Sequence, residues 1–201
     1  MSEASFLIGE PLTLDLINTH PADADLLTTP DQLADWLRQE ADRLPEPPPG
    51  QPSAEDLKQV RQVREHIAAV VAALLHGRRP PSAALRGLEN AQSAAPAVRQ
   101  LQWDGTALTT TVRRTGPAGA RLAAALAESA VELLGSPAIA RLKQCEADDC
   151  VLLFLPAHPR RRWCSPQRCG NRIRVARYYG RHSTAQRTED GSITSTAATK
   201  R

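Results

Sequence analysis

The four cysteines of the chain lie within 25 consecutive residues, as the pairs Cys145-x4-Cys150 and Cys164-x4-Cys169. Zinc in structural sites takes four tetrahedral ligands, with sulfur about 2.3 Å from the metal, and two short loops with two thiolates each supply such a set at low loop-closure cost. Two disulfides or four unrelated buried cysteines are the alternatives. The chain begins with no recognisable signal peptide, so we expect a reducing compartment, which disfavours disulfides. The sequence therefore predicts one zinc ion bound by Cys145, Cys150, Cys164 and Cys169.

This zinc is expected to be structural. A catalytic zinc usually keeps three protein ligands and one open position, whereas four thiolates fill the shell and leave the metal little Lewis acidity. His158 could replace one cysteine, but the paired spacing favours the four thiolates. The chain also has no P-loop, no glycine-rich nucleotide loop and no Ser-His-Asp order, and its five histidines are scattered. We therefore expect that the protein is not an enzyme.

The residues around the cysteines predict a small treble-clef-like domain. The apolar run 151–155 is bounded by prolines and indicates a short strand. Ser165 and Pro166 are typical of a helix start, and the helix is expected to run from Gln167 to about Arg181. A cysteine loop, a strand and a helix that carries the last ligand pair follow one another in treble-clef order.

The second cysteine pair also carries a family resemblance. The run Arg161-Arg162-Trp163-Cys164-Ser165, followed by Cys169-Gly170-Asn171-Arg172, resembles the signature of the CGNR zinc finger family. The family commonly has a lysine two residues after the motif arginine, where this chain has Arg174, so the charge is retained.

The preceding part of the chain is similar to the ABATE domain, which comes before this finger in the family. The similarity rests on residues 12–19 (LTLDLINT), 33–37 (LADWL) and 122–134, with Ser136-Pro137 and Arg141-Leu142 after them. The resemblance covers nearly the whole chain except its tail. It implies an ABATE-like domain over 1–142, a CGNR-type finger over 143–182, and a role in transcription regulation related to stress. The polar tail 183–201 is expected to be disordered.

Helix signals dominate the first 142 residues, so the expected fold class is α+β, mostly α. Thr29-Pro-Asp-Gln32 is a capping box that opens a helix to about Arg43, Ser53 caps a helix to about His76, and Ser82 caps a third helix to about residue 94. A fourth helix is expected over 118–134. Residues 98–113 predict a β-hairpin with its turn at Asp104-Gly105. A two-stranded hairpin alone is marginally stable, so we expect it to pack on the helices.

The opening segment, residues 6–19, leaves two questions open. Leu12, Leu14 and Leu16 alternate as in a strand, while Leu12, Leu16 and Ile17 would share a helix face. Three polar residues in this segment are interpreted either as groups that hold the following loop or as part of a pocket for a small-molecule effector. These residues are Asp15, Asn18 and Thr19.

The distribution of charge favours a nucleic-acid partner. Residues 156–182 hold eight arginines and no acidic residue, whereas the rest of the chain holds 17 basic and 22 acidic residues. A basic segment on an acidic protein is typical of a nucleic-acid reader. The three acids at 146–149 and the charge of a zinc tetrathiolate offset part of this excess. No apolar run approaches the roughly 18 residues of a membrane span, so we expect a soluble, cytoplasmic protein.

We expect these arginines to bind DNA in two groups. Arg160, Arg161 and Arg162 suit phosphate contacts from a loop, while Arg174, Arg177 and Arg181 could reach the backbone or base edges from a helix. Arg172 belongs to the candidate set, although its place beside Cys169 equally favours orientation of the metal site. A lone finger makes few base contacts, so a homodimer is expected to be needed. RNA binding and a protein-interaction module are the alternative functions.

Overall fold

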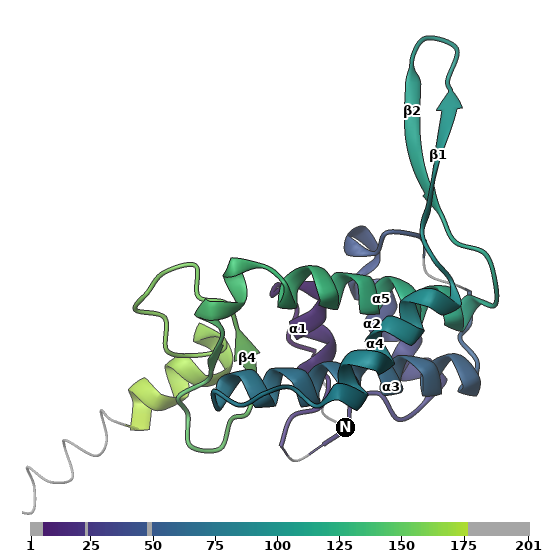
Figure 1. Cartoon of the computed structure of the whole chain (residues 1–201). Coiled ribbons are helices and arrows are strands. Elements are labelled where there is room, and N and C mark those ends of the chain that lie inside the picture. Colours follow the sequence, from purple (N-terminus) through teal and green to yellow (C-terminus); the bar gives the residue numbers. More distant parts are fainter. Residues whose placement is uncertain (1–5, 23, 48–49, 177–201) are drawn as a thin grey trace, which may run out of the picture.

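The computed structural model describes residues 6–22, 24–47 and 50–176. The expected fold class is confirmed. Five helices form a helical body, a two-stranded hairpin rises from one end of it, and the small cysteine-bearing unit lies at the other end (Figure 1). We call residues 143–176 the finger. None of the helices in the described ranges is both long and apolar enough to cross a membrane.

Local capping signals determine where two of the helices begin. Helix α2 (Pro30–Gln39) starts at the capping box of Thr29 and is followed by a 3-10 turn, Ala41–Arg43. Helix α3 (Ala54–Leu75) starts at a second capping box, in which Ser53 and Asp56 satisfy each other's backbone N–H groups. Helix α4 (Ser82–Ala94) differs from the prediction, because Pro81 is its N-cap and Ser82 its first residue. Pro81 has a φ of −62° and offers no side-chain acceptor, so the first N–H groups of α4 have no side-chain cap.

The opening segment is helical. Helix α1 (Leu12–Ile17) buries Leu14 and Leu16 completely, together with Trp36 and Leu33 of α2. Helices α3 and α5 (Ala118–Leu134) pack along each other and against α4, and their apolar faces form one continuous core. Alanine dominates the buried face of α5, so the helices can approach closely.

The hairpin is present, but the prediction that it packs on the helices is wrong. Strands β1 (Val98–Trp103) and β2 (Leu108–Arg113) pair in antiparallel register and project from the body (Figure 1). The turn spans residues 104–107, where the Asp104 carboxylate accepts hydrogen bonds from the N–H groups of Thr106 and Ala107. Leu101, Trp103 and Leu108 are each more than 60% exposed.

The finger packs against the body through its short sheet. Strand β3 (Lys143–Gln144) pairs with β4 (Leu153–Phe154), which is shorter than the strand expected over 151–155. A π-helical turn, Pro166–Gly170, follows, and residues 171–176 continue as helix. Leu153 belongs to the core of the body, whereas Phe154 and the cysteines form a second core. Adjacent residues of β4 therefore belong to two different cores.

Candidate metal centre and nucleic-acid interface

The four cysteine sulfurs lie together as a tetrahedral metal requires. All four Sγ atoms lie within 4.8 Å of one another, with Cys150 to Cys164 at 3.9 Å and Cys164 to Cys169 at 3.6 Å. A tetrahedron with Zn–S bonds of about 2.3 Å has edges of about 3.8 Å. Cys145, Cys164 and Cys169 are buried and Cys150 is half-buried, and none forms a disulfide. The residues fit one structural zinc ion.

The thiol pKa values explain why a cation would stabilise the deprotonated cluster. Burial raises the pKa of Cys150 to about 11, and burial also raises the pKa of Cys164, with the neighbouring thiols adding to both shifts. Burial acts in the same direction on Cys145, but hydrogen bonds from the N–H groups of Cys164 and Ala147 outweigh it and lower its pKa. Four thiolates in this volume repel one another and are poorly solvated. A divalent cation removes both penalties, so metal binding and deprotonation are coupled.

Two turns hold the ligand pairs in place. The first cysteine loop closes through hydrogen bonds from Cys145 N to Leu152 O and from Cys150 N to Ala147 O, both at 2.9 Å. In the second loop, Ser165 Oγ accepts from the N–H of Arg168, as the predicted N-cap. Gly170 lies against Trp163, where an added Cβ would come within 3.3 Å of the ring. The glycine of the CGNR motif thus gives the tryptophan room beside the metal loop.

The three loop arginines have different environments. Arg161 is half-buried, lies 4.4 Å from the Phe154 ring centre, forms an ion pair with Glu10 at 2.6 Å, and donates to the Cys164 carbonyl. Arg162 is exposed, pairs with Glu146 and lies over Trp163. Arg160 is exposed, and its guanidinium has no hydrogen-bond or ion-pair partner within the ranges described.

The helix arginines also divide. Arg172 pairs with Asp149 at 2.6 Å and donates to Cys169 Sγ at 3.7 Å, and these contacts fit the orienting role that its position beside the ligand favours. Arg174 is exposed and donates to Asn171 Oδ1 at 2.9 Å. Arg168, which was not among the candidates, is exposed and lines a hollow of about 300 Å³ with Arg172, next to Cys150 and Cys169. Arg177 and Arg181 lie outside the described residues, as does the tail 183–201.

Asp15, Asn18 and Thr19 are buried, and each is engaged by other parts of the chain. Asp15 accepts from the N–H groups of Gly9 and Glu10 and from Arg43, so it holds the preceding segment. Thr19 accepts from Arg64, which also binds Asp25 in the following loop. These contacts favour the loop-holding interpretation for Thr19, while an effector site at the three residues stays a prediction.

Asn18 connects the body to the finger. Its amide donates to the carbonyl of Leu153 at 2.9 Å and accepts from the N–H of the same residue at 2.8 Å, as a neighbouring strand would. Glu10 adds a second connection, because one carboxylate oxygen accepts from Leu155 N at 2.9 Å and the other pairs with Arg161. Glu10 was not predictable from the sequence, since nothing local marks a contact with residues about 145 positions away.

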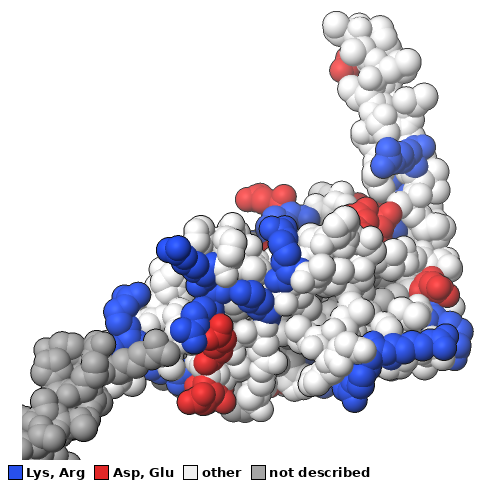
Figure 2. Space-filling view, turned by 60° about the vertical axis from the view of Figure 1, so that its left-hand side comes forward, with Lys and Arg blue, Asp and Glu red and all other residues white. Residues whose placement is uncertain are grey.

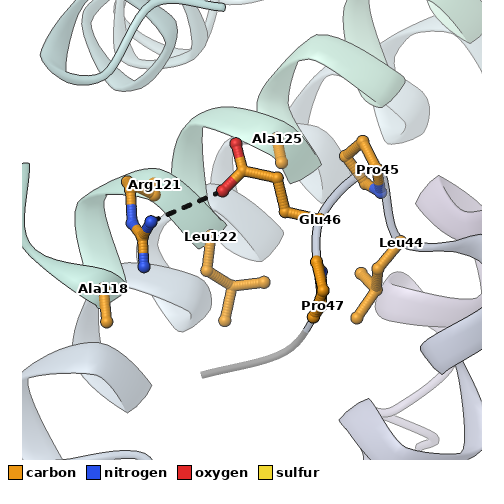
Figure 3. A pocket seen from close by; sticks show the side chains of 8 residues that line it. All are labelled: Leu44, Pro45, Glu46, Pro47, Ala118, Arg121, Leu122 and Ala125. Atoms are coloured by element: carbon orange, nitrogen blue, oxygen red, sulfur yellow. Dashed lines mark ion pairs between the residues drawn. The ribbon is translucent and has the colours of Figure 1, made fainter. Parts of the chain in front are cut away.

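Two hollows of the body are lined by residues other than these. One of about 320 Å³ opens between α3, α4 and α5, with His66 and Asn90 in its wall. Another lies between the start of α5 and residues 44–47, where Arg121 pairs with Glu46 across the opening at 3.6 Å (Figure 3). This second hollow has a volume of only about 20 Å³, close to one water molecule.

Comparison with known families divides the chain as its architecture does. Residues 10–137 match the ABATE family, described as a "putative stress-induced transcription regulator", and residues 141–182 match the CGNR zinc finger. No curated protein matches the chain significantly. The body and the cysteine site are thus each covered by a family model. The chain belongs to the ABATE family and carries a CGNR zinc finger after its ABATE domain.

Proposed function

We propose that the protein is a transcription regulator whose zinc-stabilised finger binds duplex DNA, and that it is not an enzyme. The observation that carries the proposal is the set of exposed arginines on the loop before the second cysteine pair and on the helix after it. Basic side chains gather at the finger end of the molecule, with acidic ones among them (Figure 2). The metal has no catalytic part in this proposal, because four thiolates fill its shell.

Arg160 and Arg174 are the arginines best placed for contacts with DNA. Both are exposed, and neither forms an ion pair within the described ranges. Arg162 and Arg172 would have to exchange a carboxylate for a phosphate, which lowers their net contribution. Arg161 has a structural role through Glu10 and Phe154, and we leave it out of the proposed interface.

A protein-interaction module is the competing function, and it would need an apolar finger surface. Val151 and Val175 are the large apolar residues exposed on the described part of the finger, at 41% and 52%. Single exposed apolar residues are ordinary on protein surfaces. The charged surface therefore favours DNA over a protein partner.

The proposal is tested by the salt dependence of binding to duplex DNA. Each phosphate contact releases about 0.9 condensed counterion, so Arg160→Ala should flatten the plot of log affinity against log salt by about 0.9 unit. The loss should be similar on every sequence. If Arg174 reads a base edge, Arg174→Ala should instead cost about 1–3 kcal/mol on a preferred site and less elsewhere.

The matched control is Arg86→Ala, since Arg86 is exposed on α4 and belongs to the body. Its affinity and salt slope should equal those of the wild type. The zinc content of each variant is measured first, so that a lost metal is not read as a lost contact. Absence of wild-type binding to duplex at low salt would overturn the proposal, as would an unchanged slope in the Arg160→Ala, Arg174→Ala double variant. If the protein bound RNA and not duplex DNA, RNA would replace DNA as the partner in the proposed function.

A further inference from the structure

The hairpin has one apolar and one polar face. Its register places Arg99 opposite Val112, Leu101 opposite Thr110, and Trp103 opposite Leu108, and these pairs share one face because side chains alternate along a strand. We call this the 101/103 face. The other face carries the remaining pairs, which are Val98 with Arg113, Gln100 with Thr111, and Gln102 with Thr109. Such alternation is typical of a sheet that covers an apolar surface.

The described part of the chain leaves the 101/103 face exposed. Leu101 is 73% exposed, Trp103 65% and Leu108 67%. Three large apolar side chains on one small sheet form a contiguous patch, which on a soluble protein marks an interaction site. In the segments outside the described ranges, the sequence has four large apolar residues and no alternating apolar run; these residues are Met1, Tyr178, Tyr179 and Ile193. Another chain is therefore a better candidate than a segment of this chain to cover the 101/103 face.

The base of the hairpin is held firmly. Arg114, whose side chain is 2% exposed, donates to the carbonyl of Ala95 at 2.8 Å and pairs with Glu128 of α5. This arginine follows β2 while Ala95 precedes β1, so it joins both ends of the hairpin to each other and to the body. The 101/103 face is thus presented in a fixed direction.

The same face borders a hollow at the corner between hairpin and body. The hollow has a volume of about 520 Å³, and its wall includes Arg99 and Val112 from the hairpin and Glu128 and Glu132 from α5. The guanidinium of Arg99 is exposed here, with no ion-pair partner in the described ranges.

We propose that the protein forms a homodimer in which the 101/103 faces of two hairpins pack against each other in antiparallel orientation. The Leu101–Thr110 pair lies midway between the Arg99–Val112 and Trp103–Leu108 pairs. A two-fold axis across the strands at this level places Leu101 against the partner's Leu101 and Val112 against the partner's Leu108. It also places Arg99 against the partner's Trp103, where a cation–π contact can form.

In this pairing the large side chains of each face meet suitable partners on the other face. Apolar side chains meet apolar side chains, and the one charge on the face meets an aromatic ring rather than a like charge. The antiparallel direction brings the tip of each hairpin to the corner hollow of its partner. A parallel pairing would place both helical bodies at the same end, where the α5 side of each corner would obstruct the other.

The size of the contact is sufficient for a specific, concentration-dependent dimer. An aromatic side chain such as Trp103 buries about 150–250 Å², and Leu101, Leu108 and Val112 add to it, so the two faces together would bury on the order of 1,000 Å². This area is at the lower end of specific interfaces, and contacts at the two hollows would add to it. The interface is isologous, as expected for a two-fold dimer.

The first test compares the two faces of the hairpin. Sedimentation velocity of the full zinc-loaded chain at micromolar concentrations, without nucleic acid, should show a species of twice the chain mass. Leu101→Asp places two like charges against each other at the axis and should weaken dimerisation by at least about tenfold. The control Gln100→Asp introduces the same charge at the adjacent position on the polar face and should leave the dimer unchanged.

The second test addresses orientation with a pair of variants at one position. Trp103→Glu and Trp103→Lys lose the same ring, but in the antiparallel dimer the new side chain faces the partner's Arg99. The glutamate variant should therefore dimerise more tightly than the lysine variant, by about tenfold at low salt, and the difference should shrink in high salt. In a parallel dimer residue 103 faces the partner's Leu108, and the two variants would behave alike.

Several results would overturn the proposal. A wild-type chain that stays monomeric at high micromolar concentration excludes the dimer, and a dimer that survives Leu101→Asp uses another surface. Equal affinities for Trp103→Glu and Trp103→Lys exclude the antiparallel arrangement. Circular dichroism and zinc content confirm that each variant is folded. Because no nucleic acid is present, these outcomes are independent of the proposed DNA binding.

Discussion

Among the individual residues, Glu40 has the least favourable environment for a charge. Its side chain is completely buried, between Asp15 and Arg43. Burial, with the charge of Asp15 as a second cause, raises the pKa of Glu40 from 4.5 to about 7. Burial also raises the pKa of Asp15, although hydrogen bonds from Arg43 and Gly9 oppose the shift. One arginine therefore serves two buried carboxyl groups, and one of the two holds a proton near neutral pH.

This proton makes the stability of the protein depend on pH. The unfolded chain releases the Glu40 proton near pH 4.5, while the folded chain keeps it up to about pH 7. The folded state binds more protons between these values, so the free energy of unfolding should fall as pH rises through this window, by up to about 3 kcal/mol. Glu40→Gln stays neutral and should remove this loss.

The measurement is urea unfolding of wild type and Glu40→Gln from pH 4.5 to 8. The difference between the two proteins should grow with pH in favour of the variant, and contributions common to both, including zinc binding, cancel. Glu55→Gln is the control, because Glu55 lies exposed on α3 and its loss should leave the pH profile unchanged. A constant difference between wild type and Glu40→Gln across the range would contradict the shifted pKa.

At the scale of elements, the metal loops depend most directly on single side chains. Cys169→Ser removes one thiolate from the four-sulfur cluster and should release the zinc, after which the finger should lose its protection from protease. The wild type should contain about one zinc per chain by elemental analysis. The helical body of the variant should keep its helices, because its core is formed mainly by α1 to α5.

A matched substitution separates loss of the metal from local weakening. Ser165→Ala removes the N-cap of the same turn, which costs about 1 kcal/mol, but leaves all four ligands in place. This variant should retain zinc with the wild-type stoichiometry. If Cys169→Ser still held one equivalent of zinc, the assignment of Cys169 as a ligand would be wrong.

The elements that the sequence predicted best are those with local signals. Thr29 and Ser53 mark helix starts because their partners lie three residues away. The cysteine spacing likewise indicates a metal site through residues close in the chain. The alternation along 98–113 also separates the two faces of the hairpin. It does not show whether the hairpin packs on the body, since exposure depends on where the rest of the chain lies. The six residues of α1 fit both the two-residue repeat of a strand and the 3.6-residue repeat of a helix, so only packing could decide between the two.

At the scale of the whole molecule, the finger and the helical body share structure through β4. Leu153 packs in the core of the body while Phe154 packs beside the cysteines. Asn18 and Glu10 hold the backbone of this segment at Leu153 and Leu155. Neither contact was predictable, because each joins residues more than 130 positions apart. Folding of the metal site should therefore stabilise the body, and the body should stabilise the metal site.

This coupling predicts that the wild type unfolds in one transition. Zinc release, followed with a colorimetric chelator, and loss of helix, followed by circular dichroism, should have the same midpoint in urea.

Asn18→Ala leaves both the N–H and the carbonyl of Leu153 buried without their partner, at a cost of about 2–4 kcal/mol. The finger should then separate from the body, so that zinc release precedes loss of helix. The control Asn90→Ala, at an exposed position on α4, should keep the single transition. Two separate transitions already present in the wild type would mean that the finger folds independently, and that the contacts of Asn18 and Glu10 position it without contributing to its stability.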